Sequence, residues 1–182
     1  MGIALAAPAQ EAPIERREIK EIQPNSWIDH PLYWGTPNVC YAPGQVVKIG
    51  RTGPSPDVGH SALYTFQYPY TPAGAKCWIS FKAGAGATIN NPRGVDIDVF
   101  SSTAPGSCSG GSSSNYRDQN WGRLKVTTGG VATWVQTSGG LSSPVPCKPA
   151  GSYEWVELVA AGDSTWLSYL QQWGQGLVIN YQ

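Results

Sequence analysis

The sequence has few charged side chains and few histidines, and both shortages exclude classes of function. Only 13% of its 182 residues are charged, and twelve basic residues balance twelve acidic ones. A chain without a basic excess lacks the electrostatic footprint that attracts nucleic acid or an anionic membrane surface. The histidines, His30 and His60, do not fit the copper site of polysaccharide-oxidising enzymes, which uses the histidine at the mature N-terminus. Nucleic-acid binding and copper oxidase chemistry are therefore not expected.

Long apolar runs and closely spaced cysteine pairs are also missing. No stretch approaches the ~18–20 consecutive apolar residues of a membrane-spanning helix. The four cysteines show no C-x-x-C spacing, which argues against a zinc site or a thioredoxin-like redox pair. Their even number favours two disulfides formed in an oxidising compartment, and three pairings are possible. We favour the pairs Cys40 with Cys108 and Cys77 with Cys147.

Glycine, proline and aromatic residues are plentiful, which is typical of many short strands joined by turns. The chain has 22 glycines, 15 prolines, eight tryptophans and nine tyrosines. Apolar residues alternate with polar ones in residues 76–82, 95–100 and 154–160, and a period of two indicates strands with one buried face. The sequence predicts one all-β domain over residues 27–182, an antiparallel β-sandwich that is jelly-roll-like or related.

Residues 1–26 differ from the remainder in composition. The first ten residues resemble the small-residue end of a secretory signal peptide, and Arg16 and Arg17 resemble a dibasic processing site. The segment 11–21 carries seven charges and little apolar periodicity. We expect residues 1–26 to be a leader remnant, a propeptide or a disordered arm, and the mature protein to be soluble and extracellular.

A hairpin is predicted over residues 115–136, with Gly129 and Gly130 as the two turn residues. In this register Leu124 faces Val135 on the apolar side. Lys125 faces Trp134 on the wet side, where a cation–π contact would be worth ~0.5–1 kcal/mol.

The first strand of this hairpin begins with an unusually polar block. Its side chains offer a guanidinium fork, carboxamides and a carboxylate beside an indole ring, groups that recognise sugar hydroxyls or the backbone of a protein partner. The alternative is that Arg117 and Asp118 brace the preceding Ser/Gly-rich loop, and we favour that structural role. The candidate binding surface consists of Arg117, Asp118, Asn120, Trp121, Lys125 and Trp134.

Two further patterns imitate catalytic or metal sites. Cys108 lies in a G-x-C-x-G sequence like a nucleophile elbow, but a Ser/Gly-rich run supplies no following helix, so a disulfide is favoured. Asp96 and Asp98 share one strand face and would suit a hard cation or an acid/base pair, but we favour a solvated strand face, because no EF-hand spacing supports calcium. We therefore predict no catalytic residue, no metal site and no cofactor.

Several motifs together resemble a fungal family, the C-terminal domain of the ubiquitin 3 binding protein. They are KCWISF, IDVFSS, NYRDQNWGRLKV, CKPAG, YEWVELVAAGD and GLVINYQ, within residues 68–182. The resemblance implies a β-sandwich found in secreted fungal proteins and carries no catalytic residue. For the name-giving member it implies binding to a ubiquitin-like activating enzyme, an intracellular role that fits poorly with a secretory leader.

The predicted function is therefore that of a secreted, non-catalytic, effector-like and monomeric module, which binds polysaccharide or a protein on a cell wall or host surface. Two alternatives stay open. One is a protein-interaction domain for a ubiquitin-like activating enzyme, and the other is a secreted polysaccharide hydrolase.

Overall fold

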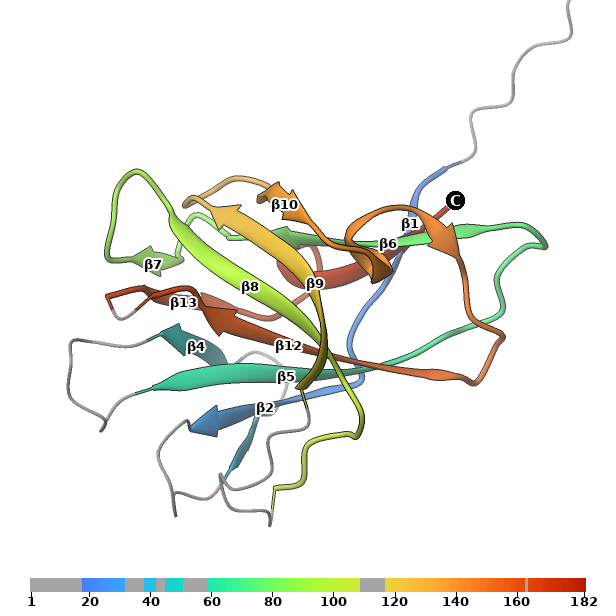
Figure 1. The fold of residues 1–182 in the computed structure, drawn as a ribbon, viewed down its shortest axis with the longest axis horizontal. Helices are drawn as coiled ribbons and strands as arrows, with labels where there is room; N and C mark the ends of the chain where they lie inside the picture. The colour runs from blue at the N-terminus through green and yellow to red at the C-terminus, as the bar shows by residue number, and fades with distance from the viewer. Residues whose placement is uncertain (1–17, 32–37, 42–44, 51–58, 109–116, 163) are drawn as a thin grey trace, which may run out of the picture.

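The computed structural model describes residues 18–31, 38–41, 45–50, 59–108, 117–162 and 164–182. These residues form two antiparallel β-sheets that pack against each other, so the predicted all-β sandwich is confirmed (Figure 1). A single 3₁₀ turn, η2 (Gly140–Ser142), is the one helical element in this part of the chain.

The smaller sheet has the strand order β1-β14-β6-β11 among the described residues. Its strands bring the last residues of the chain between segments from much earlier in the sequence. Their bounds are β1 (Lys20–Ile22), β14 (Gly176–Tyr181), β6 (Lys76–Lys82) and β11 (Val145–Pro146).

The larger sheet has the order β10-β9-β8-β12-β5-β4-β13-β7, and β2 pairs with both β5 and β3. Figure 1 shows β8, β12 and β5 running side by side through its centre. The bounds are β10 (Thr133–Thr137), β9 (Arg117–Val126), β8 (Val95–Ser102), β12 (Tyr153–Ala160), β5 (His60–Gln67), β4 (Val46–Gly50), β13 (Trp166–Leu170), β7 (Thr88–Ile89), β2 (Ser26–Pro31) and β3 (Val39–Tyr41).

The core lies between the sheets and follows the predicted alternation. On β6, Cys77, Ile79 and Phe81 are buried, while the residues between them are half-buried. On β8 the same holds for alternate positions from Val95 to Val99. Because each buried aliphatic or aromatic side chain contributes about 1.5–3 kcal/mol, this alternation fixes which face of each strand turns inward.

The predicted register of the hairpin is wrong near its turn. Lys125 lies opposite Thr133, and Trp134 lies opposite Leu124 rather than Lys125. The cause is that the chain leaving the turn bonds to β6, where the N–H of Ala132 donates to the carbonyl of Phe81. The register near the turn is thereby shifted by one residue, and an irregularity between Trp134 and Gln136 restores the predicted pairing of Arg123 with Gln136.

The sandwich begins before the predicted start at residue 27. Lys20 to Ile22 forms strand β1 on the edge of β14, and Ile22 is buried in the core. Two of the charges that suggested an arm, Lys20 and Glu21, are exposed side chains of this edge strand, where charge discourages pairing with other chains. Residues 1–17 of the predicted arm lie outside the described residues.

Both predicted disulfides are present. Cys40 pairs with Cys108 and Cys77 pairs with Cys147, with Cα atoms 5.4 and 4.9 Å apart. The second bond ties β6 to the segment after β11 within the core, whereas both cysteines of the first are exposed.

Candidate functional site

The six residues of the predicted binding surface do not form one surface. Trp121 is buried in the core, and Trp134 is half-buried against it. Lys125 forms an ion pair with Asp96 at 3.1 Å on the outer side of the larger sheet. Asn120 is exposed, and its Oδ1 accepts a hydrogen bond from the N–H of Gly122. Of the predicted set, Asp118 and Trp121 line one cleft together.

Arg117 has a structural partner that sequence analysis missed. Its Nε and Nη2 donate to the two carboxylate oxygens of Glu157 on β12, at 2.7 and 2.9 Å. Ser61 on β5 donates to the same carboxylate at 2.6 Å. The Glu157 side chain is only 5% exposed, so the guanidinium neutralises a charge that water barely reaches. Arg117 therefore joins β9 to the centre of the sheet.

The two aspartates on β8 also have cross-strand partners. Asp98 accepts two hydrogen bonds from Arg123, at 2.6 and 3.0 Å, and Asp96 pairs with Lys125. No cluster of three or more histidine, cysteine or acidic side chains suited to a metal occurs among the described residues. In this arrangement the aspartates stabilise strand pairing on a partly solvated face.

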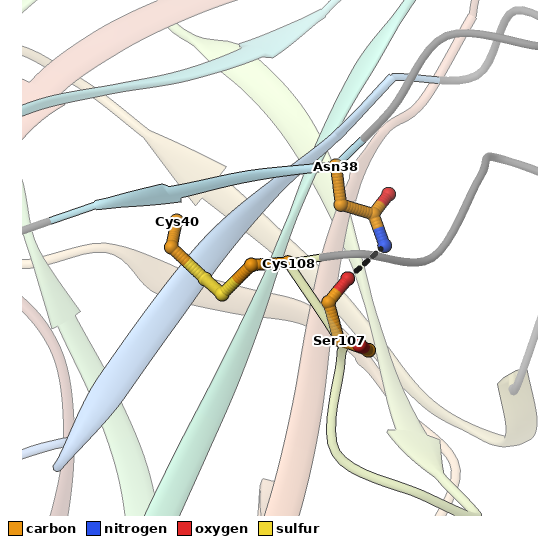
Figure 2. Close-up of a disulfide and its surroundings, with 4 residues drawn as sticks. All are labelled: Asn38, Cys40, Ser107 and Cys108. Carbon is orange, nitrogen blue, oxygen red and sulfur yellow. Dashed lines mark hydrogen bonds between the residues drawn. A yellow bond between two sulfur atoms is a disulfide. The ribbon is translucent and has the colours of Figure 1, made fainter.

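Cys108 and the histidines are also engaged in structural contacts. Figure 2 shows the Cys40–Cys108 disulfide beside Asn38, whose Nδ2 donates to the carbonyl of Ser107 at 3.0 Å. His30 bonds to the Oδ1 of the same asparagine at 2.8 Å. A disulfide thus links Cys108 to β3, a hydrogen bond links Ser107 to Asn38 just before that strand, and Cys108 carries no free thiol.

His60 contacts the carboxylate of Asp29 at 2.8 and 2.9 Å, and the hydroxyl of Tyr41 donates to that carboxylate at 3.1 Å. Burial, together with the Asp29 charge, raises the pKa of Tyr41 above its usual value. The Asp29 carboxylate is buried, and His60 and Tyr41 occupy its hydrogen-bonding positions on two sides.

A cleft of about 370 Å³, here called the aromatic cleft, lies at one end of the sandwich. It lies where β8 ends, β9 begins and β12 begins, with η2 and β11 on the other side. Segments far apart in the sequence meet there. Its lining consists of Tyr68, Ser101, Ser102, Thr103, Asp118, Gln119, Trp121, Gly140, Leu141, Val145, Pro146, Lys148, Tyr153, Glu154 and Trp155.

Two of the residues that line the aromatic cleft, Tyr153 and Trp155, have parallel aromatic rings. Tyr153 and Trp155 are two residues apart on β12, so their side chains share a face of the strand. Their ring planes are parallel within 5°, and the ring centroids are 6.4 Å apart. Tyr153 is 47% exposed. The indole N–H of Trp155 is buried and has no hydrogen-bond acceptor among the described residues, so ring packing rather than a polar bond holds this side chain.

The local backbone explains the position of these rings. A turn at residues 149–152 closes with the N–H of Ser152 donating to Pro149, and Gly151 occupies it with φ +81°. Tyr68 brackets this turn, because its N–H bonds to Ser152 and its carbonyl accepts from Gly151. These hydrogen bonds therefore fix the position of the turn and of Tyr153, which follows it and lines the cleft.

The charged groups of the cleft are of two kinds. Glu154 is buried and held by Lys148 at 3.0 Å and by the hydroxyl of Tyr68 at 3.3 Å. Burial, followed by the nearby Glu154 charge, raises the pKa of Tyr68, so this phenol stays protonated as a donor. Asp118 is exposed and has no ion-pair or hydrogen-bond partner within the described part of the chain. One carboxylate is thus neutralised, and the other is open to a ligand.

Trp121 forms the floor of the cleft and explains a glycine at η2. A Cβ atom at Gly140 would overlap the indole ring, and Gly140 also has φ +54°. The side chain is 5% exposed, so Trp121, which was predicted as part of the binding surface, is a core residue that also lines the cleft.

The sequence analysis assigned alternate residues of β12 to the core but made no prediction for the residues on the opposite face of the strand. The spacing of Tyr153 and Trp155, two aromatics on that face, was the available signal. Lys148 and Tyr68 had no such signal, because only the fold brings them beside β12.

No protein-family model matches this chain, and no curated protein matches it. The resemblance to the fungal family therefore stays a prediction. The part of the chain that the structure describes contains no helix long and apolar enough to cross a membrane.

Proposed function

We propose that this protein is a secreted, non-catalytic module that binds carbohydrate on a cell wall or host surface, and that the aromatic cleft is its binding site. The observation that carries this proposal is the parallel pair Tyr153 and Trp155 beside the open carboxylate of Asp118.

The chemistry of the cleft suits a sugar. Aromatic rings pack against the apolar C–H face of a pyranose, while their rigid shape costs little conformational entropy on binding. An ionised carboxylate accepts hydrogen bonds from two hydroxyl groups, and the Lys148 ammonium donates to others. Asp118 and Lys148 lie in the same cleft as the two rings. The cleft therefore combines a stacking wall with polar groups that would set orientation.

The contacts of Glu154 support a binding function without catalysis rather than a hydrolase. Glycoside hydrolysis ordinarily needs two carboxyl groups, one as acid and one as base or nucleophile. The second carboxylate of this cleft is tied to Lys148 and Tyr68. A secreted setting is supported by the two disulfides, which persist in oxidising compartments.

A sedimentation assay with insoluble polysaccharides tests this function. Wild-type protein is mixed with insoluble β-1,3-glucan, chitin and cellulose, and the fraction that sediments with each is measured. We expect retention on at least one of them, loss of that retention in Trp155→Ala, and no release of reducing ends. Tyr70→Ala is the matched control, because Tyr70 is 83% exposed but lies outside the aromatic cleft.

Failure of the wild type to bind any polysaccharide, or equal loss in Tyr70→Ala, would contradict the proposal. Release of reducing ends that Asp118→Asn abolishes would instead establish a hydrolase.

A further inference from the structure

A second concave feature lies at the connection between β1 and β2. It has a volume of about 250 Å³, and the turn between β13 and β14 forms its other side. We call it the tryptophan groove. Its lining consists of Gln23, Pro24, Asn25, Trp27, Gln171, Gln172 and Trp173.

Trp173 is presented to solvent on a firmly braced turn. Its side chain is 79% exposed, so the indole ring offers an open apolar face to a ligand. The neighbouring Gln171 is 1% exposed, and its amide donates to the carbonyls of Gln175 and Leu177 while its Oε1 accepts from the Leu177 N–H. The turn is thus held in place although the ring at its tip packs on little.

A buried indole lies behind this exposed one. Trp27 is 5% exposed and stacks on Tyr64, with ring centroids 6.4 Å apart. Its Nε1–H has no acceptor among the described residues. Buried polar groups nearly always have a partner, so this unpaired donor is unusual, and it belongs to a residue that lines the groove.

The lining identifies the kind of ligand. It contains no charged side chain, and three of its members are carboxamides that lie at or near the surface: Gln23, Asn25 and Gln172. A carboxamide offers both donors and an acceptor, which suits the hydroxyl groups of a neutral sugar. The exposed face of Trp173 supplies the stacking surface. An anionic or cationic ligand would find no counter-charge in this lining.

The two concave sites are close together along the sheet. Gln67 at the end of β5 lies opposite Tyr153 on one side, and its N–H donates to Oδ1 of Asn25 on the other, at 2.9 Å. Residues of the aromatic cleft and the tryptophan groove therefore flank β5 on opposite sides, on strands that lie two spacings, or roughly 10 Å, apart. A polymer of sugar units reaches between such positions, whereas a single sugar unit occupies one.

We infer that the tryptophan groove is a second carbohydrate subsite, and that the ligand is an extended, neutral polysaccharide that engages Trp173 as well as the aromatic cleft. This inference rests on the proposed function. Linking two sites through one polymer raises the apparent affinity on the order of 100-fold over either site alone.

Nuclear magnetic resonance of the indole N–H groups tests the inference. The protein is labelled with ¹⁵N and titrated with soluble fragments of the polysaccharide that it retains, one short and one long. Trp155→Phe and Trp173→Phe assign the two signals. We expect the long fragment to shift both signals, and Trp173→Ala to weaken its binding on the order of 100-fold, with the affinity for the short fragment unchanged. Tyr70→Ala is the matched control.

The possible results separate the two proposals. A shift of Trp155 alone at saturation would overturn the second subsite and leave the proposed function standing. A shift of Trp173 alone would support the groove and contradict the aromatic cleft. A Trp173 signal that moves with protein concentration in the absence of sugar would assign the groove to a second copy of the chain and overturn the inference.

Discussion

Arg117 donates two hydrogen bonds to the carboxylate of Glu157, at 2.7 and 2.9 Å, across the face of the larger sheet. Its guanidinium also lies 5.5 Å from the centre of the Phe100 ring. Through these contacts Arg117, at the start of the polar block, connects β9 to β8 and β12.

The first prediction follows from this tie. Arg117→Ala leaves the buried Glu157 carboxylate without its main partner, and we expect the free energy of unfolding to fall by about 1–3 kcal/mol. Urea denaturation measures the change. Arg123→Ala is the matched control, because its pair with Asp98 is more exposed, with the arginine side chain 39% accessible. The control should lose about 1 kcal/mol or less.

Equal losses in the two variants, or an Arg117→Ala unfolding curve that overlaps the wild-type curve, would show that the Glu157 contact contributes little. A readout of function gives a further check. Because Arg117 lies outside the lining of both proposed sugar sites, folded Arg117→Ala should keep wild-type carbohydrate affinity.

The two disulfides should differ in their resistance to reduction. Cys40 and Cys108 are both exposed, whereas Cys77 is fully buried in the core. A mild reductant applied to the folded protein should therefore open Cys40–Cys108 first, as mass spectrometry after alkylation would reveal. Removing either bond by paired serine substitutions should cost up to about 4 kcal/mol in the loop-closure model, since the bonded cysteines are 68 and 70 residues apart. Earlier alkylation of Cys77 would contradict the expected order.

Stability should decline in alkali because of buried tyrosines. Burial, with an added contribution from Tyr169, raises the pKa of Tyr64, and burial raises the pKa of Tyr169 and Tyr68 as well. In the unfolded chain these phenols ionise near pH 10. The stabilisation is thus fully present below about pH 10 and is lost as the pH rises above it, since the native state resists ionisation.

Denaturation measured between about pH 8 and 12 would reveal this decline, with tyrosinate absorbance as the second signal. Tyr68→Phe removes one of the phenols and should flatten the decline. A free energy of unfolding that stays constant across this range would show that the three phenols ionise alike in the folded and unfolded chain.

Much of the fold was predictable because burial imposes a period of two on each strand. Residues Cys77 to Phe81 and Val95 to Val99 alternate in sequence and alternate in burial. The hairpin register was not predictable in the same way. Whether the turn has two residues depends on the bond that Ala132 makes to β6, a strand some fifty residues earlier, and a local pattern does not encode that contact.

The candidate site was only partly predictable for a related reason. Asp118 and Trp121 belong to a polar block that stands out in the sequence, and both line the aromatic cleft. Nothing in the sequence around Tyr68 and Lys148 marks them as site residues. Only the pairing of β5 with β12 places them beside Glu154. Trp121 also shows why an indole in a polar sequence need not be exposed, since its ring fills the space left by Gly140.

The central claim is that Tyr153 and Trp155 form a sugar-binding wall, and calorimetric titration of a double variant tests it most directly. Wild type, Tyr153→Ala/Trp155→Ala and Tyr70→Ala are each titrated with a short soluble fragment of the retained polysaccharide, after thermal unfolding has shown that all are folded. We predict binding by the wild type and the Tyr70→Ala control and none by the double variant. Wild-type affinity in the folded double variant would contradict the claim.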